Sequence, residues 1–143
     1  MSGPDQEDRA VGAGEEDAPV TVLVVDDQES FRTVVREVVA ATDGLILVGE
    51  AASGEDGLAA AEELLPQLVI MDKRMPGIGG IEACRLMVER RPDVVVVLVS
   101  VEEPNIPALT SCGAVAFVQK QELTRRFLRE VWRAHGSPAR DAG

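Results

Sequence analysis

Apolar positions change their spacing several times between residues 20 and 135. Five short runs, rich in Val, Leu and Ala, have the length and the β-branched content of strands. The predicted strands are Val20–Val25, Leu45–Val48, Leu68–Met71, Val94–Val99 and Ala114–Val118. This composition suits buried parallel strands that are covered by helices.

The segments between these runs have the spacing of amphipathic helices. The predicted helices are Ser30–Ala41, Ser53–Leu65, Gly80–Arg90 and Leu123–His135. Ser53, followed three positions later by Asp56, has the pattern of a helix-initiating capping box. The connection between residues 100 and 113 contains two prolines, so at most a short or degraded fourth helix is expected there. Alternating strands and helices predict a parallel α/β sheet.

The chain of 143 residues has the length of one domain, and we predict that residues 19–136 form it. Residues 1–18 contain six acids and one base without apolar periodicity, which predicts a disordered acidic tail. Residues 137–143 are predicted to be a flexible C-terminal tail. The last helix is expected to end before them, at the sequence Gly136-Ser137-Pro138.

The net charge of −11 argues against a general nucleic-acid-binding surface. The apolar runs are too short to span a bilayer, and the acidic N-terminus does not resemble a secretory signal, so we expect a cytoplasmic location and no membrane contact. Cys84 and Cys112 lack the spacing of a metal or redox pair. They are expected to be small buried side chains in a reducing compartment.

Polar residues follow four of the five predicted strands. Asp26 and Asp27 follow the first strand, Asp72 the third and Ser100 the fourth, while Lys120 comes after the fifth. Open α/β sheets bind ligands outside the carboxyl ends of their strands, at the topological switch point. In the strand order 2-1-3-4-5 these four strands are contiguous, so we expect all five side chains to converge on one place.

Three close carboxylates and one lysine favour cation binding at this place, because the carboxylates cannot all stay ionised without compensation. A few oxygen ligands suit Mg²⁺, which retains several of its waters. Mg²⁺ and Lys120 would neutralise charge on a transferring phosphoryl group, and Asp72 would be the nucleophile that accepts it. Ser100 would donate a hydrogen bond to a phosphoryl oxygen.

Four segments together resemble the response regulator receiver (CheY-like) family over about residues 20–135. The segments are Val24-Val25-Asp26-Asp27, Met71-Asp72-Lys73-Arg74-Met75-Pro76-Gly77, Leu98-Val99-Ser100 and Gly113-Ala114-Val115-Ala116-Phe117-Val118-Gln119-Lys120. Each segment alone is common, but their order and their placement at strand ends are specific. The resemblance implies a (βα)5 flavodoxin-like fold, a doubly wound parallel five-stranded sheet in the order 2-1-3-4-5.

The resemblance also implies roles for individual residues. Asp72 would accept a phosphoryl group from the phosphohistidine of a sensor histidine kinase or a phosphotransfer protein. Asp27, Asp72 and the backbone carbonyl of Arg74 would hold Mg²⁺, and Asp26 would hold a metal-bound water. The chain would then be a phosphoacceptor signalling domain rather than an enzyme with an external substrate.

Three further residues would report the phosphorylated state in such a domain. Lys120 would pair with the phosphoryl group, and Ser100 and Phe117 would be the switch pair. The serine would move toward the phosphoryl group and the aromatic ring would turn inward behind it. A downstream protein partner would then read the change, without direct contact between this chain and nucleic acid.

Three other interpretations remain open from the sequence. The chain could be a receiver-like interaction module that signals without phosphorylation, or the receiver half of a truncated DNA-binding transcriptional regulator. A phosphatase with an aspartate nucleophile is the poorest reading, because it needs a second acid two positions after the nucleophile and Arg74 stands there.

Two features depart from the family pattern. Val101 stands where the family usually has a small residue, which predicts slower attack of water on a phosphorylated Asp72. The short, proline-containing connection after residue 100 predicts that phosphorylation causes little or no conventional dimerisation.

Overall fold

Five parallel strands form one sheet in the order β2-β1-β3-β4-β5, as expected from the sequence. The computed structural model describes residues 18–103 and 111–136, and every structural statement below concerns these residues. The strands are β1 (Val20–Val25), β2 (Leu45–Ala51), β3 (Leu68–Asp72), β4 (Val95–Ser100) and β5 (Ala116–Gln119). The first four lie within a few residues of their predicted bounds, and β5 begins two residues later than predicted.

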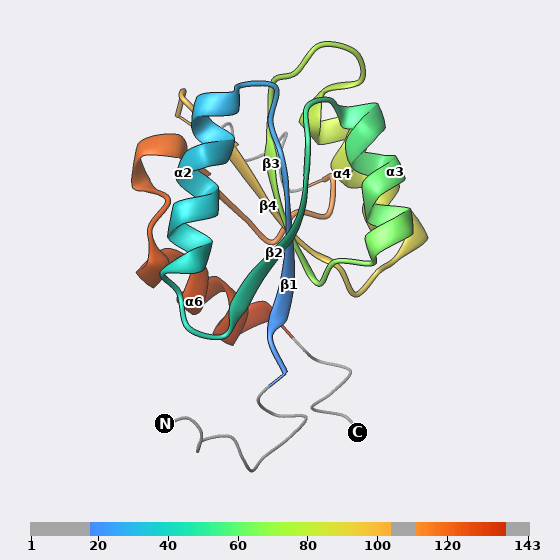
Figure 1. Cartoon of the computed structure of the whole chain (residues 1–143). Helices are drawn as coiled ribbons and strands as arrows, with labels where there is room; N and C mark the ends of the chain where they lie inside the picture. Colours follow the sequence, from blue (N-terminus) through green and yellow to red (C-terminus); the bar gives the residue numbers. More distant parts are fainter. Residues whose placement is uncertain (1–17, 104–110, 137–143) are drawn as a thin grey trace, which may run out of the picture.

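Helices cover both faces of this sheet (Figure 1). They are α2 (Glu29–Ala40), α3 (Gly54–Leu64), α4 (Gly79–Arg90), α6 (Arg125–His135) and the short 3₁₀ helix η2 (Lys120–Glu122). Helices α2 and α6 pack on one face, and α3 and α4 pack on the other. This is the doubly wound, flavodoxin-like arrangement that the sequence predicts.

Alternation along β1 divides the core into two clusters. Val22 and Val24 belong to the cluster under α2 and α6, whereas Leu23 and Val25 belong to the cluster under α3 and α4. Successive side chains of a strand point to opposite faces, so a strand covered on both sides must be apolar throughout. Every residue of β3 and β4 is buried for the same reason.

The predicted helix start at Ser53 is confirmed. The Ser53 hydroxyl oxygen accepts a hydrogen bond from the backbone N–H of Asp56 at 3.0 Å, which satisfies one of the free donors at the start of α3. Helix α2 also begins close to its expected position, and its buried residues include Val35 and Val39. Val34, which we assigned to the same apolar stripe, is 42% exposed.

The four-residue spacing of Leu123, Phe127, Val131 and His135 predicts that they form one apolar stripe of the last helix, and this prediction is partly wrong. Leu128 is fully buried, whereas Phe127 is only partly buried and His135 is exposed. Steps of four residues advance about 40° per step around a helix with 3.6 residues per turn, so such a stripe leaves the buried face within a few turns. The pair Leu128 and Val131, three positions apart, faces the sheet instead.

The predicted tails lie outside the described residues, except for residue 18. The expected shortening of the fourth helix falls on residues 104–110, which are also outside them. The structure therefore describes the folded core and the residues that follow each strand.

An ion-pair cluster joins β2 to α2 on the surface. The carboxylate of Glu50 accepts hydrogen bonds from Arg36 at 2.9 and 3.1 Å and from Arg32 at 3.3 Å. The hydrogen bond from Arg36 holds the pKa of Glu50 below its ordinary value, against the opposing effect of partial burial. A lowered pKa means that the folded state favours the ionised carboxylate.

Glu50→Gln is therefore expected to lower the thermal unfolding midpoint at neutral pH. The contribution of Glu50 is present above the carboxyl pKa of the unfolded chain, and it is lost as the pH falls through the lowered pKa of the folded chain. Thermal melts of both proteins across this range should converge in acid. Glu63→Gln is the control, because Glu63 is exposed and forms no ion pair in the described part of the chain. Its unfolding midpoint should equal that of the wild type at every pH.

Candidate functional site

The carboxyl ends of four strands bring the predicted side chains together. A cavity of about 180 Å³ opens there and is lined by Asp27, Gln28, Asp72, Arg74, Ser100, Val101 and Lys120. Six of these residues are the last residue of a strand or lie within two positions after it. Gln28 lies three positions after the end of β1. Asp26 lies behind the cavity and contacts it through Lys120.

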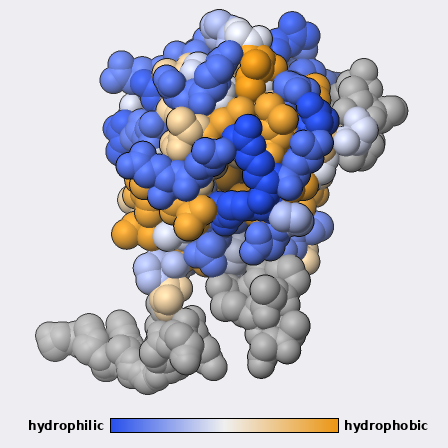
Figure 2. Space-filling model, turned by 90° about the vertical axis from the view of Figure 1, so that its right-hand side faces the viewer, coloured by the Kyte–Doolittle hydropathy of each residue, from blue (hydrophilic) through white to orange (hydrophobic). Residues whose placement is uncertain are grey.

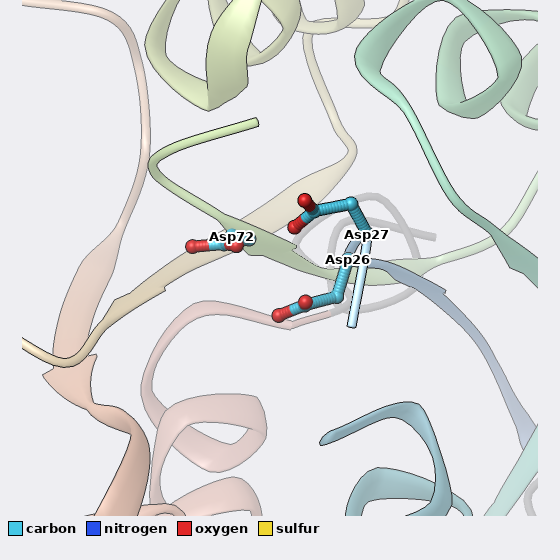
Figure 3. A group of neighbouring side chains, drawn as sticks. All are labelled: Asp26, Asp27 and Asp72. Atoms are coloured by element: carbon cyan, nitrogen blue, oxygen red, sulfur yellow. The ribbon is translucent and has the colours of Figure 1, made fainter. Parts of the chain in front are cut away.

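Three carboxylates form the acidic part of the site (Figure 3). Each of Asp26, Asp27 and Asp72 offers an oxygen, and these oxygens all lie within 4.8 Å of one another. Asp26 is completely buried and Asp72 is 6% exposed, whereas Asp27 faces solvent. The register explains this closeness, because Val25 at the end of β1 lies beside Met71 of β3.

Asp26 is held in place from three directions. Its Oδ1 atom accepts a hydrogen bond from the backbone N–H of Gln28 at 2.8 Å, and its Oδ2 atom lies 2.7 Å from the Lys120 ammonium. Its backbone carbonyl accepts a hydrogen bond from Arg32 at 2.7 Å. Burial of an ionised carboxylate is costly without such partners, so Asp26 and Lys120 form a coupled structural pair.

Asp72 lies in an environment that disfavours its negative charge. Burial raises the pKa of its carboxyl above the ordinary value, and the negative charges of Asp26 and, less strongly, of Asp27 raise it further. A hydrogen bond from the backbone N–H of Arg74 to Oδ1, at 3.2 Å, and the charge of Lys120 oppose this shift. A cation beside Asp72 would favour its ionised form and so oppose this shift.

Lys120 is the only cation within ion-pair distance of these carboxylates in the described residues. Its ammonium nitrogen lies 2.7 Å from Asp26, 3.5 Å from Asp72 and 3.3 Å from the side-chain oxygen of Gln28. The same nitrogen lies 4.6 Å from the centre of the Phe31 ring, which allows a cation–π contact. These contacts hold the ammonium beside the mouth of the cavity.

Ser100 and Phe117 lie on neighbouring strands beside the site. The Ser100 hydroxyl oxygen accepts a hydrogen bond from the backbone N–H of Glu102 at 3.1 Å, and a hydroxyl that accepts in this way can still donate its own proton. Phe117 is partly buried and pairs in register with Leu98 on β4. A small cavity of about 10 Å³ is lined by both residues together with five neighbours.

Sequence reasoning missed three residues at the site. Gln28 contacts Lys120, and Glu102 forms an ion pair with Arg74 at 2.9 Å across the cavity edge. Gly80 packs so tightly that a Cβ atom there would lie 2.0 Å from the backbone oxygen of Asp72. The first two have no sequence signal beyond standing within three positions of a strand end, whereas Gly80 ends the glycine-rich sequence Gly77-Ile78-Gly79-Gly80, which does not by itself indicate close packing against Asp72.

The sequence profile of the response regulator receiver domain family matches residues 22–131. The chain belongs to this family. The matched range includes every residue of the site described above, and within the described residues the fold is that of a receiver. The family match therefore confirms the resemblance to response regulator receivers that the sequence motifs indicated.

Two curated response regulators illustrate the similarity. The response regulator GacA of Pseudomonas syringae is 47% identical over 103 residues, which cover 71% of this chain and 48% of GacA. The nitrate/nitrite response regulator protein NarL of Escherichia coli is 31% identical over 118 residues, which cover 81% of this chain and 55% of NarL. The chain thus spans about half the length of the curated relatives that it matches.

Solved receiver structures share the fold. The response regulator domain of Thermotoga maritima CheB is 32% identical, with a TM-score of 0.70 over 82% of this chain and 96% of that domain. The receiver domain of NarL from Mycobacterium tuberculosis is 28% identical, with a TM-score of 0.70 over 82% of this chain and 93% of that domain. No helix in residues 18–103 or 111–136 is long and apolar enough to cross a membrane.

The acidic pocket of this receiver suits a small divalent cation. Its oxygen donors come from Asp26, Asp27 and Asp72, and one of the three faces solvent, so a cation that keeps part of its water shell can enter. Burial and the charge of Asp26 also raise the pKa of the Asp72 carboxyl, and a bound cation would oppose both effects. Receiver domains typically bind Mg²⁺ at such a pocket.

Proposed function

We propose that Asp72 accepts a phosphoryl group from a sensor histidine kinase or a phosphotransfer protein, and that the phosphorylated domain changes its binding to a protein partner. The observation that carries this proposal is the convergence of Asp72, Asp27 and the Lys120 ammonium on one open cavity of about 180 Å³, with the carboxylate of Asp26 directly behind it. Membership of the receiver family supports the same reading.

The chemistry requires one bond to form and one to break. A carboxylate oxygen of Asp72 attacks the phosphorus of a phosphohistidine, and the phosphorus–nitrogen bond breaks with its electron pair passing to the imidazole nitrogen of the donor. Lys120 lies 3.5 Å from Asp72, close enough to pair with the transferred group after a small rotation of its side chain. The Ser100 hydroxyl proton is available for a phosphoryl oxygen.

Mg²⁺ is the cofactor that we propose for this step. Asp27, Asp72 and the backbone carbonyl of Arg74 would hold the ion directly, and Asp26 would hold one of its waters. When bound, Mg²⁺ offsets the negative charge of the carboxylates and of the phosphoryl oxygens. The exposed position of Asp27 and the place of Arg74 in the cavity wall support these assignments.

Ser100 and Phe117 are proposed as the pair that transmits the change. Movement of the Ser100 hydroxyl toward a phosphorylated Asp72 would enlarge the small cavity that both residues line. The partly buried ring of Phe117 would then turn inward and alter the surface beside β5. This explains how one covalent change at Asp72 reaches a partner-binding face.

The remaining assignments concern the setting of the domain. We propose that its direct partners are proteins, which the net charge of −11 supports. Cys84 and Cys112 are buried beside each other without forming a disulfide, which supports a reducing, cytoplasmic location. Because the matched relatives are about twice as long, the receiver could also be one half of a longer regulator whose other half contacts DNA.

The test is binding of beryllofluoride, which mimics a phosphoryl group on a carboxylate. Amide NMR spectra of the wild type with Mg²⁺ and beryllofluoride are expected to show shifts around Asp72, Ser100 and Phe117. The shifts should require Mg²⁺ and be absent from Asp72→Asn. Absence of binding to the wild type would reject phosphorylation and favour the module that signals without it.

Val101→Ala is expected to speed the loss of phosphate from Asp72 by a factor of a few. Val101 is 66% exposed and lines the cavity, so its branched side chain restricts the approach of water to the phosphorylated carboxylate. Dephosphorylation of both proteins can be followed by the decay of radiolabelled phosphate. Val101→Ile keeps the bulk and is the control; equal rates for valine and alanine would remove this explanation.

A further inference from the structure

A second cavity lies between α3 and α4, on the face of the sheet that these two helices cover. Its volume is about 180 Å³, and five of its eight lining residues are apolar. Figure 2 views this side of the molecule and shows an apolar hollow bordered by hydrophilic side chains. Val94, at its floor, precedes the start of β4, whereas Asp72 and Ser100 stand at the opposite ends of their strands. The length of β4 separates the two sites by about 17 Å.

The apolar wall comes mainly from one face of α3. Leu58, Ala61 and Leu65 line the cavity from that side, and Met87 of α4 lines it from the other. Leu65 ends α3 with a left-handed backbone (φ 51°), a conformation that normally favours glycine, and its side chain is 58% exposed at the cavity rim. A strained backbone here presents a large apolar side chain to solvent.

The polar part of the cavity carries one unbalanced charge. Arg90 forms an ion pair with Glu62 at 2.5 Å, so these two lining residues neutralise each other. Arg91 forms no ion pair in the described part of the chain, and its Nη1 atom is buried without a hydrogen-bond partner there. Arg91 lines the cavity, so the positive charge of its guanidinium group favours an anionic group there.

We infer that this cavity binds a small aromatic carboxylate, with the ring among the apolar side chains and the carboxylate on Arg91. An apolar cavity of about 150 Å³ is large enough for benzene, so about 180 Å³ fits one ring with a short substituent. The single uncompensated charge of Arg91 selects a monoanion. Guanidinium and carboxylate groups also match in geometry, since both are planar.

The test is a titration of the full 143-residue chain with phenylacetate, followed by amide NMR. Phenylacetate is expected to give saturable shifts at the end of α3 and at residues 90–95. Phenylacetamide, which has nearly the same shape without the charge, should bind at least about tenfold more weakly. Equal binding of the two compounds would contradict the role given to Arg91.

Two matched variants locate the charge. Arg91→Met is expected to abolish the preference for phenylacetate over phenylacetamide, whereas Arg90→Met, which removes the neighbouring ion-paired arginine, should keep it. Thermal melts of both variants verify that they fold. Loss of the preference in Arg90→Met alone, or shifts only at Asp72, would overturn the proposal.

Two further observations separate this site from the proposed phosphoacceptor. Beryllofluoride shifts should be unchanged in Arg91→Met, so failure of either proposal leaves the other intact. The inference fails if phenylacetate gives no saturable shift up to about 10 mM, a concentration at which even millimolar binding would be visible. Broadening of the same resonances with protein concentration alone would show a second copy in the cavity and would also overturn it.

Discussion

Replacing Lys120 by methionine is expected to lower the free energy of unfolding by about 3 kcal/mol in Mg²⁺-free buffer, because the change breaks a buried ion pair. The Lys120 ammonium lies 2.7 Å from the completely buried Asp26, and its side chain is itself only 10% exposed. Without the ammonium, no cation among the described residues lies within ion-pair distance of the carboxylates of Asp26 and Asp72. The lost cation–π contact with Phe31 adds a smaller destabilisation.

Urea unfolding with and without Mg²⁺ measures this effect. Added Mg²⁺ is expected to restore part of the stability of Lys120→Met, since the ion supplies the missing positive charge to the same carboxylates. Lys73→Met is the control, because the only ion pair of Lys73 within the described residues is with the exposed Glu102, at 4.0 Å. A Lys120→Met protein as stable as the wild type without Mg²⁺ would show that Asp26 does not depend on this pair.

Gly80→Ala is expected to destabilise the fold by at least about 3 kcal/mol, at the upper end of the usual cost of overpacking. A Cβ atom at this position would lie 2.0 Å from the backbone oxygen of Asp72 and 2.9 Å from the Cα atom of Lys73. These are backbone atoms, which cannot move aside as the end of a side chain can. The start of α4 or the end of β3 would have to shift, and Asp72 would shift with it.

Gly79→Ala is the neighbouring control. Gly79 has a left-handed backbone (φ 72°), but a Cβ atom there would meet nothing closer than 3.8 Å. Its substitution should therefore cost only about 1 kcal/mol, the strain of a left-handed alanine. Chemical unfolding of both variants compares the two costs, and beryllofluoride binding should be weakened in Gly80→Ala beyond Gly79→Ala. Similar effects at both positions would show that close packing against Asp72 is unimportant.

The sheet could be predicted from the sequence because its strands are covered on both faces. A continuous apolar run such as Val94–Val99 has few alternatives to a buried parallel strand, and the polar residue after it marks its carboxyl end. Asp26, Asp72 and Lys120 therefore converge for topological reasons, without knowledge of any side-chain contact. The candidate site followed from that rule, whereas the strand order followed from the resemblance to the receiver family.

Other features depend on three-dimensional packing and had no sequence signal. The rotation of α6 about its axis decides that Leu128, rather than Phe127, is fully buried, and this rotation is set by where the helix begins after η2. The ion pair of Glu102 with Arg74 joins two loops that are 28 positions apart. The unpaired Nη1 atom of Arg91 depends on how α4 ends against α3.

Lys120 contacts Gln28, which stands 92 positions earlier in the chain. The site is therefore assembled from residues that are synthesised at very different times. A ribosome makes Asp26 and Asp72 well before β5, and these carboxylates lack their ammonium partner until β5 has emerged and docked beside β4. A nascent chain that stops before residue 120 would therefore have an acidic pocket but no complete acceptor. Under the proposed function, phosphorylation would be confined to chains that have finished folding, so that incomplete products do not draw phosphate from the kinase.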